Sequence, residues 1–476
     1  MDDQLAYTPA TELTAAITGR RLSAVEVTHT LLARIDRLNP LINAYCTVTA
    51  DLALAAARRA DERLRRGESP GPLHGVPVSI KDLTPTAGIR TTFGSKAFEN
   101  YIPDEDAIVV ERMRRAGAII LGKTNTPELG AKSVTDNAIF GHTRNPWKLD
   151  RIPGGSSGGA GAALAAGLGP LAEGSDFAGS IRIPSSCCGV AGLKPSMGRV
   201  PNYPSLLVPA GSLNGFTGMF TSGPMARTVR DVALLFAVMA GPDDRDPQSL
   251  PATGEDWARA AEGGIAGLRV AWSPDLGYAR VDPEVRAITT AAARAFTELG
   301  CVVEEAHPGF ANPESTFQDL ASPIRRAACE PYLATMRERM DPMLFERITR
   351  TDGMTALHHE LAQHRRTAHW HIVRRFFERY DLLLTPTLSV APFPIGATQP
   401  AEIDGHPITY FEWFPFTFPF NLTGQPAMSV PCGFTQDGLP VGLQIIARRF
   451  ADATLLRAAA AFEAVRPWSH RRPSFN

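Results

Sequence analysis

The sequence predicts an α/β fold, and two patterns carry that prediction. The first is a strand, a helix and a second strand, expected at 73–82, 106–116 and 118–121. A unit of this kind places its two strands parallel in one sheet. The second is a pair of strands at 427–432 and 441–446, separated by the turn residues Asp437 and Gly438, which is typical of a hairpin. The chain therefore combines parallel and antiparallel units.

Composition and charge are those of an ordinary globular protein. Of 476 residues, 44% are hydrophobic and 20% are charged, and the formal net charge is −1. Length alone suggests about three domains. A charge balance this close to zero gives no indication of a nucleic acid or an anionic membrane as partner. The six cysteines have no zinc or redox spacing, which favours free thiols in a reduced compartment.

The N-terminus and the hydropathy pattern bear on location. The first residues lack a basic region followed by an apolar one, which argues against a secretory signal. No uninterrupted apolar run reaches the length that crosses a membrane. We therefore expect a soluble, cytoplasmic protein.

Helices are predicted first along the chain, over residues 10–66. Ser23 is a helix cap followed by apolar residues at helical spacing, and we expect Asn39 and Pro40 to end that helix. The alanine-rich segment 51–66 predicts another helix, closed by Gly67.

The first predicted strand carries a lysine at its end. Val76, Val78 and Ile80 share one face of the strand, and Ser79 and Lys81 share the other. Taken alone, Lys81 is best interpreted as a snorkelling lysine or as one ion-paired with the neighbouring Asp82.

The remaining elements follow from periodicity and composition. Small residues predict a helix at 160–166, whose N-terminus would direct free amides toward the serines before it. The region 243–380 is helical, more charged and poor in motifs, and 411–420 is an aromatic run more typical of a core than of a pocket. Further elements are expected at 171–173, 188–193, 381–386 and 451–465.

Three familiar motifs match in letters but not in context. Residues 117–124 satisfy the phosphate-loop pattern, yet their variable positions form the strand itself, whereas that loop must follow a strand. His359 and His364 resemble a zinc helix but stand one residue too far apart, so a solvated helix face is the better interpretation. Ser157 fits a nucleophile elbow, but no strand leads into it and no later aspartate and histidine stand out.

A glycine-rich stretch with two adjacent serines dominates the sequence. Glycine at this density lets backbone approach a ligand closely, and a third serine, Ser180, follows another run of small residues. With other segments in the same order, this stretch forms a set of motifs: 75–82 (GVPVSIKD), 122–128 (GKTNTPE), 141–147 (GHTRNPW), 153–159 (PGGSSGG), 174–184 (GSDFAGSIRIP), 188–195 (CGVAGLKP) and 421–426 (NLTGQP).

Together these segments resemble the amidase signature family. They occur in the family's order from near residue 10 to the C-terminus, so the resemblance covers nearly the whole chain and is very specific. It implies a single domain over residues 1–476, with a mixed, largely parallel sheet flanked by helices. Within that domain, helices at 1–66 would pack on the core, and about 243–380 would be a helical insertion on the substrate side.

The resemblance also implies the roles of the site residues. Ser180 is the nucleophile, Ser156 the bridging serine after a cis peptide bond from Gly155, and Lys81 the base. The family pattern assigns further roles as follows: the amides of Phe177, Ala178, Gly179 and Ser180 form the oxyanion hole, Ser157, Asp176 and Arg182 brace the loops, and Gly130, Gly154 and Gly155 are candidates for substrate contact. Ala178 departs from the pattern, which has glycine there, so its backbone is more restricted.

The chemistry agrees with these roles. A serine hydroxyl is a poor nucleophile until a base takes its proton, and lysine is a base only when neutral. Burial at the end of an apolar strand lowers the pKa of a lysine. Lys81 would then deprotonate Ser156, which deprotonates Ser180 as it attacks a carbonyl. No metal or cofactor is required.

The expected reaction is hydrolysis of the C–N bond of a neutral, hydrophobic or aryl amide, with carbamates (urethanase activity) or esters as further candidate substrates. The expected partners are a small-molecule amide and at most a second copy of the chain, as monomer or homodimer. The charge-poor walls expected for the cleft are Leu206, Leu207, Val208, Phe216, Met219, Phe220 and the aromatic run, with Lys132 and Arg199 as the nearest charged residues. The alternatives are the A subunit of a glutamyl-tRNA amidotransferase and, more remotely, a catalytically silent binding protein.

Overall fold

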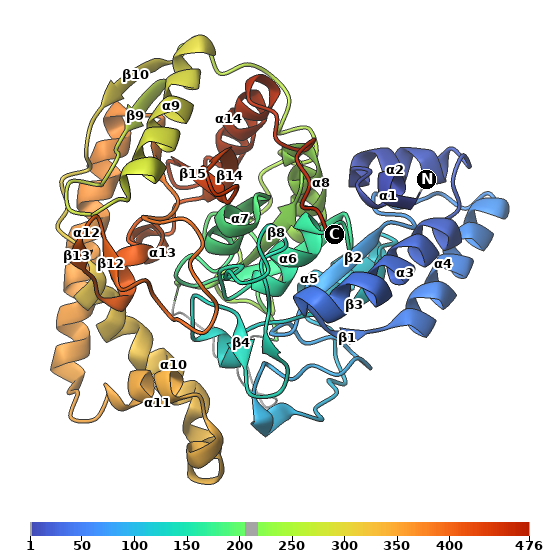
Figure 1. Cartoon of the computed structure of the whole chain (residues 1–476), viewed down its shortest axis with the longest axis horizontal. Coiled ribbons are helices and arrows are strands. Elements are labelled where there is room, and N and C mark those ends of the chain that lie inside the picture. Colours follow the sequence, from blue (N-terminus) through green and yellow to red (C-terminus); the bar gives the residue numbers. More distant parts are fainter. Residues whose placement is uncertain (1, 205–217, 476) are drawn as a thin grey trace.

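A mixed β-sheet runs through the protein, and the computed structural model describes residues 2–204 and 218–475 of it (Figure 1). Within these ranges the sheet has 11 strands in the order β1-β3-β2-β6-β8-β7-β14-β15-β11-β9-β10. The strands are β1 (Tyr45–Val48), β2 (Pro77–Lys81), β3 (Ile119–Thr124), β6 (Leu171–Asp176), β7 (Ala191–Lys194), β8 (Thr221–Ala226), β9 (Arg269–Trp272), β10 (Val302–Glu305), β11 (Leu382–Pro386), β14 (Ala427–Phe434) and β15 (Pro440–Ala447). Separate two-stranded ribbons are β4 (Asp136–Asn137) with β5 (Gly141–His142) and β12 (Glu402–Ile403) with β13 (His406–Pro407).

Strand direction changes across the sheet. β3, β2 and β6 run parallel to one another, and so do β11, β9 and β10. Every pairing from β6 to β11 through β8, β7, β14 and β15 is antiparallel, and so is that of β1 with β3. The α/β class and the mixed, helix-flanked sheet are confirmed. Parallel pairing, however, is restricted to two flanks and does not dominate, because consecutive elements such as β14 and β15 return through short turns instead of helical crossovers.

Helices cover both faces of this sheet. Their bounds are α1 (Asp2–Ala6), α2 (Ala10–Thr18), α3 (Ala24–Ile42), α4 (Ala50–Arg65), α5 (Ile108–Arg115), α6 (Gly158–Ala165), α7 (Arg182–Cys188), α8 (Val229–Met239), α9 (Pro283–Glu298), α10 (Glu314–Met336), α11 (Pro342–Thr349), α12 (Ala356–Arg379), α13 (Pro419–Thr423) and α14 (Asp452–Val465). Short 3₁₀ turns occur at Lys96–Phe98, Glu128–Gly130, Arg337–Arg339 and Tyr410–Trp413. No helix among the described residues is long and apolar enough to cross a membrane.

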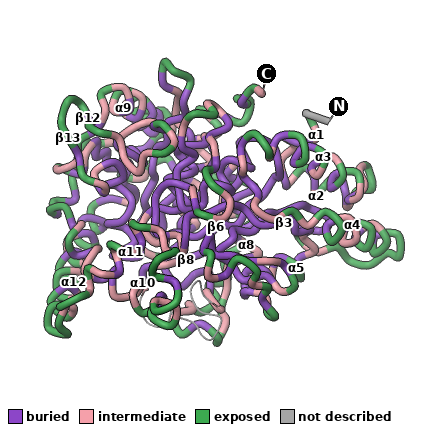
Figure 2. The backbone as a smooth tube through the Cα atoms, turned by 60° about the horizontal axis from the view of Figure 1, so that its bottom comes forward, coloured by how far each residue is buried: buried purple, intermediate pink, exposed green. Residues whose placement is uncertain are grey.

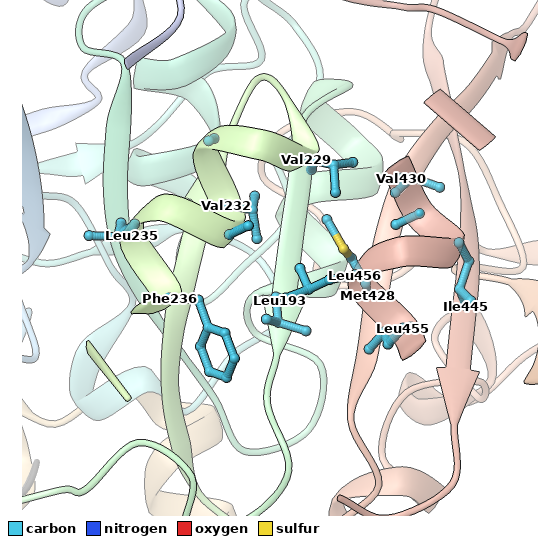
Figure 3. Packing of buried hydrophobic residues seen from close by; sticks show 14 of the residues in the cluster. Leu193, Val229, Val232, Leu235, Phe236, Met428, Val430, Ile445, Leu455 and Leu456 are labelled. Carbon is cyan, nitrogen blue, oxygen red and sulfur yellow. The ribbon is translucent and has the colours of Figure 1, made fainter. Parts of the chain in front are cut away.

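One face packs against α5, α8, α9 and α14. Figure 3 shows Val232 and Phe236 of α8 beside Leu193 of β7, with Leu455 of α14 next to Met428 of β14. Residues of this core share the alternation expected of strands: Val78 and Ile80 of β2 belong to it, whereas Ser79 and Lys81 do not. Lys81 therefore points to the opposite face, where α6 and α7 lie.

The N-terminal helices extend one end of the sheet (Figure 1). They pack with α6 in a second core that includes Leu31 of α3 and Leu121 of β3. Ser23 caps α3 as predicted, accepting a hydrogen bond from Glu26 N at 2.9 Å. The predicted end of α3 at Asn39 and Pro40 is wrong, because the helix continues to Ile42 and ends at Asn43, which is in the left-handed conformation.

The segment 243–380 is not purely helical. It supplies β9 and β10 to the central sheet, between its helices and a long loop. The long helices α10 and α12, with α11, lie at the side of the molecule far from α2–α4 (Figure 1). The buried backbone is concentrated in the middle, along strands such as β6 and β8, while α4 and α12 carry much exposed surface (Figure 2). The predicted hairpin is confirmed as β14 and β15, with Gly438 at positive φ.

Candidate active site

Lys81 lies at the end of β2, beside the end of β6. β2 and β6 are parallel neighbours, so their carboxyl ends meet at one rim of the sheet. The Lys81 side chain is fully buried, and its Nζ lies 2.7 Å from Ser156 Oγ and 3.0 Å from Ser175 Oγ. Lysine and the predicted bridging serine are therefore in direct hydrogen-bond contact.

Ser156 stands in the glycine-rich loop that leads into α6. The peptide bond between Gly155 and Ser156 is cis. An added Cβ on Gly155 would lie 2.7 Å from Val134 O, so only glycine lets the two backbones approach this closely. Gly154 packs in the same way against Ile183 and Pro184. The tight packing of the loop fixes where Ser156 lies.

Ser180 follows β6 in the loop that leads into α7. It is buried, and its carbonyl accepts a hydrogen bond from Ser157 N at 3.1 Å, which joins the two serine loops. No hydrogen bond connects the hydroxyls of Ser156 and Ser180 among the described residues.

Asp176 and Arg182 form the buried brace of the Ser180 loop. Both side chains are fully buried, and Arg182 Nη2 lies 2.9 Å from Asp176 Oδ1. Asn421 Nδ2 donates to the same oxygen at 2.9 Å, and Gln444 Oε1 accepts from Arg182 Nη1 at 2.7 Å. Burial alone would raise the pKa of Asp176, but the charge and hydrogen bonds of Arg182 hold that pKa well below its usual range. The loop is thus anchored by a charged pair with satisfied hydrogen bonds.

The four amides predicted as an oxyanion hole are not equivalent. Gly179 N donates to Asp176 Oδ1 at 2.8 Å, so this amide is already engaged in bracing the loop. In the described part of the chain, the amides of Phe177, Ala178 and Ser180 donate to no protein acceptor. The oxyanion hole stays a prediction, and these three amides are the ones whose N–H groups have no protein acceptor in the described residues.

The substitution of alanine for glycine at position 178 causes no backbone strain. Ala178 is not among the residues with positive φ, whereas Gly179 has a φ of +114°. An added Cβ on Gly179 would meet Thr417 Oγ1 at 2.5 Å. The position that requires glycine is thus 179, and it has one.

Burial sets the protonation of the lysine. It lowers the pKa of Lys81 to about 7, against the opposing charges of Glu173 and Asp176. Burial also raises the pKa of Glu173 to about 7, while Lys81 N donates to its carboxylate at 3.1 Å. A lysine with this pKa is largely neutral in mildly alkaline solution and can accept a proton.

The other predicted positions have definite surroundings. Ser157 Oγ contacts the backbone of Ser175, accepting from its N–H at 3.3 Å, so it ties the glycine loop to β6. Gly130 faces Ser156, because an added Cβ would stand 3.3 Å from Ser156 Oγ. Contact of Gly130, Gly154 or Gly155 with a substrate stays a prediction.

Sequence reasoning missed several residues that support the site. Ser175 contacts Lys81, Glu173 accepts from its backbone, and Thr417 Oγ1 donates to Ala178 O at 2.6 Å. Asn421 belongs to the 421–426 motif but received no role. Strand alternation could have identified Ser175, because residues two apart on a strand share a face and Ser175 lies two residues after Glu173 on β6.

Aromatic rings pack beside Phe177. Its ring meets that of Phe317 edge to face at 5.7 Å, and Phe317 meets Phe411 and Phe418. Phe411 and Phe418 are buried, so the aromatic run is core at these positions. Of the predicted cleft walls, Leu206, Leu207, Val208 and Phe216 lie outside the described residues, and Met219 is buried.

Charged residues near these rings differ from those expected. Lys132 is ion-paired with Asp136 and Asp341, and Arg199 lies 3.9 Å from Asp452, so each already has a carboxylate partner. Arg325 instead lies over the Phe177 ring at 5.1 Å, and Arg347 over the Tyr410 ring at 4.6 Å.

The structure also places the phosphate-loop, zinc-helix and nucleophile-elbow patterns, which match in letters but not in context. Residues 119–124 of the phosphate-loop pattern are β3 itself. His359 lies on α12 beside Glu360 on the exposed side of the helix, and no described group of three or more His, Cys, Asp or Glu could hold a metal ion. Ser157 Oγ is engaged by the Ser175 backbone.

Comparison with known proteins gives the family. The Amidase family model matches residues 26–456. An acylamidase from Rhodococcus erythropolis is 44% identical over 479 residues, covering 99% of this chain and 98% of its own. The A subunit of a glutamyl-tRNA(Gln) amidotransferase from Moorella thermoacetica is 39% identical, with 99% of both chains covered.

Solved structures agree with the sequence relatives. A bacterial aryl acylamidase of the amidase signature family superimposes with a TM-score of 0.91 at 32% identity, over 98% of this chain and 97% of the other. A 6-aminohexanoate cyclic dimer hydrolase gives a TM-score of 0.87 at 33% identity, over 98% of this chain and 99% of the other. This chain belongs to the amidase signature family and is an amidase-type hydrolase.

Proposed function

We propose that this enzyme hydrolyses the C–N bond of neutral, hydrophobic or aryl amides through an acyl-enzyme on Ser180. The observation that carries the proposal is the 2.7 Å contact between Ser156 Oγ and a fully buried Lys81 whose pKa burial lowers to about 7. A buried lysine with a serine partner and no directly paired carboxylate is suited to act as a base.

The proton moves through the two serines. Neutral Lys81 takes the proton of Ser156, and Ser156 takes that of Ser180 as its oxygen attacks the substrate carbonyl. A tetrahedral oxyanion forms, stabilised by the free amides of Phe177, Ala178 and Ser180. When the C–N bond breaks, the proton returns through Ser156 to the leaving amine. Water then attacks the ester and releases the acid, with the same residues acting as base.

The substrate class is supported by the rings around Phe177. Phe177, which is partly buried and packs edge to face on the buried Phe317, offers apolar surface in the candidate nucleophile loop. Burying an aryl or alkyl group on such surface contributes about 25 cal/mol per Å² of apolar area. Relatives named acylamidase and aryl acylamidase agree with this class. Carbamates and esters contain the same electrophilic carbonyl, and we propose them as secondary substrates.

A second candidate function rests on Arg325 and Arg347. Burial, helped by the charge of Arg347, lowers the pKa of Arg325 to about 9, and no carboxylate pairs with Arg325 among the described residues. Guanidinium groups beside the nucleophile loop would suit a substrate that carries a carboxylate, such as glutamine. The 39% identity to the A subunit of an amidotransferase supports that candidate.

The deciding experiment combines labelling with matched substrates. A fluorophosphonate probe should label the wild type on Ser180 and leave Ser180→Ala unlabelled, whereas an unlabelled wild type would indicate a silent binding protein. Specificity constants are then compared for an anilide, a long-chain amide, a carbamate, an ester and glutamine. A higher kcat/KM for glutamine than for the anilide would replace the first candidate by the second.

The relay has its own kinetic test. Ser180→Ala, Lys81→Ala and the double variant should lose nearly the same factor in kcat, because the residues act as one unit. Losses that multiply in the double variant would contradict a shared proton path.

Location and assembly stay predictions. We infer a cytoplasmic protein, which the six unpaired cysteines support, and a monomer or homodimer.

A further inference from the structure

A cavity lined by none of the candidate catalytic residues opens beside α12. Its volume is about 390 Å³, large enough for a small organic ligand. Its walls include Gln363, Arg366, Thr367 and Trp370 of α12, with Arg449 from the segment that follows β15. None of these residues was assigned a role in the proposed reaction.

The cavity is positively charged. Two of its lining residues, Arg366 and Arg449, are cationic, and none of the described residues that line it is acidic. Burial lowers the pKa of Arg366, and the charge of Arg449 lowers it further. Two guanidinium groups that repel one another, with no carboxylate between them, leave a positive potential for an anion to neutralise.

Arg449 stacks on two aromatic rings, and its guanidinium donates no hydrogen bond to the described part of the chain. Its guanidinium lies 4.4 Å from the ring centroid of Phe450 and 5.6 Å from that of Trp370. Within the described residues it makes no hydrogen bond or ion pair, and its buried Nε has no partner. Stacking occupies the faces of a guanidinium and leaves its N–H groups, which lie in the plane, for an acceptor.

The other wall is also built from fixed donors. Arg366 Nε donates to Leu422 O at 2.7 Å, and its Nη2 donates to Gly218 O at 2.5 Å, so the side chain is positioned before any ligand arrives. Gln363, Thr367 and Trp370 stand on the same side of α12, at intervals of three and four residues. Thr367 Oγ1 donates to Gln363 O at 3.0 Å, so the side-chain amide of Gln363 and the indole N–H of Trp370 are the donors on this side that suit an oxyanion.

We propose that this cavity binds a small oxyanion, namely the phosphate or carboxylate group of a soluble small molecule, with Arg449 as its principal ligand. Arg449 presents the paired donors that phosphate and carboxylate oxygens accept in bidentate fashion. Arg366 supplies the second charge, and α12 supplies neutral donors. The cavity exceeds the size of inorganic phosphate, which leaves room for the remainder of the ligand.

The test measures binding by isothermal titration calorimetry and by the shift of Tm. Inorganic phosphate and citrate are titrated separately into the full chain, at ionic strength matched with sodium chloride. We expect saturable binding of at least one, and an increase in Tm as that ligand saturates the site. Binding of phosphate alone or of citrate alone identifies which oxyanion the cavity takes. No binding of either one, or a Tm shift that chloride reproduces, would overturn the proposal.

Two variants locate the site. Arg449→Gln should weaken binding roughly tenfold or more, because a charge-assisted hydrogen bond is lost. Arg448→Gln is the matched control, since Arg448 is its exposed neighbour and lines no part of the cavity; its affinity should equal that of the wild type. Circular dichroism checks that each variant folds, and Gln363→Ala provides a milder change should Arg449→Gln be unfolded. Equal binding by Arg449→Gln and wild type would refute the assignment.

Discussion

At the scale of single residues, the site depends on keeping a lysine uncharged near carboxylates. Glu173 and Asp176 would both favour a protonated Lys81, yet burial outweighs them and lowers its pKa to about 7. Asp176 interacts chiefly with Arg182, which draws that carboxylate into a separate pair. Burial therefore lowers the pKa of Lys81 far enough for the side chain to accept a proton near neutral pH.

The first prediction concerns pH. The base must be neutral, so kcat/KM should rise between about pH 6 and 8, with an apparent midpoint near the pKa of about 7. Glu173→Gln removes a charge that raises the pKa of Lys81, so the midpoint should move to lower pH. Initial rates across a buffer series measure both curves. A rate that falls as pH rises through 7 would contradict the role of Lys81 as base.

The second prediction concerns the stability of the buried pair. Asp176→Asn leaves the buried Arg182 without its counter-charge, which should lower the free energy of unfolding by about 3–5 kcal/mol. Because the pKa of Asp176 is depressed, its contribution is present above its ordinary pKa near 4 and is lost as pH falls below it.

Denaturant unfolding at pH 7 and at pH 3 measures this effect. Glu378→Gln, which breaks the exposed pair with Arg374, is the control and should change stability far less. An Asp176→Asn variant as stable as the wild type would show that the pair does not hold the loop.

The residues that sequence reasoning missed share one physical cause. Lys81, Ser156 and Ser180 were identified through motifs, which are local in sequence. Asn421 reaches Asp176 across 245 positions of chain, and spacing along a sequence says nothing about such a contact. Gly179 was assigned to the oxyanion hole through the family resemblance, but only the fold reveals that its amide donates to Asp176.

At the scale of elements, two parallel strands and two short helices assemble the site. β2 and β6 end at one rim of the sheet. The glycine-rich loop after β5 leads into α6, and the loop after β6 leads into α7, on the face where Lys81 points. The strand alternation that placed Lys81 opposite Val78 and Ile80 was predictable from sequence. The end of α3 was not, because Pro40 is accommodated close to the C-terminal end and Asn43 provides the true termination.

The third prediction tests the loop between β6 and α7. Gly179→Ala places a Cβ against Thr417 at a φ of +114°, which should displace the neighbouring amides and reduce kcat roughly 100-fold or more. Ala178→Gly is the control, because position 178 has no positive φ and loses only a methyl group, so its kcat should stay within a few fold. Steady-state kinetics on one anilide measures both. Equal effects of the two changes would contradict this account of the loop.

At the scale of the whole molecule, the antiparallel pairing of β8 with β6 and β7 was the feature least accessible from sequence. Strands such as β7 and β8 are short and rich in small residues, so their periodicity carries little signal. The region 243–380 was expected to be helical because α9, α10 and α12 dominate it, and the short strands β9 and β10 were hidden between them. The order and direction of the strands depend on pairing between distant segments, which local sequence patterns do not reveal.

The last prediction follows from the completeness of the site within one chain. Lys81, Ser156, Ser180 and the Asp176–Arg182 brace all come from this polypeptide, and their hydrogen bonds are internal. The proposed reaction therefore draws every group it uses from this chain. The purified chain alone should hydrolyse an anilide, at a mass of one or two copies by light scattering, and its kcat should not rise when cell extract is added. Activity that appears only with co-purifying proteins would instead favour the amidotransferase function, for which a transferase partner must use the released ammonia.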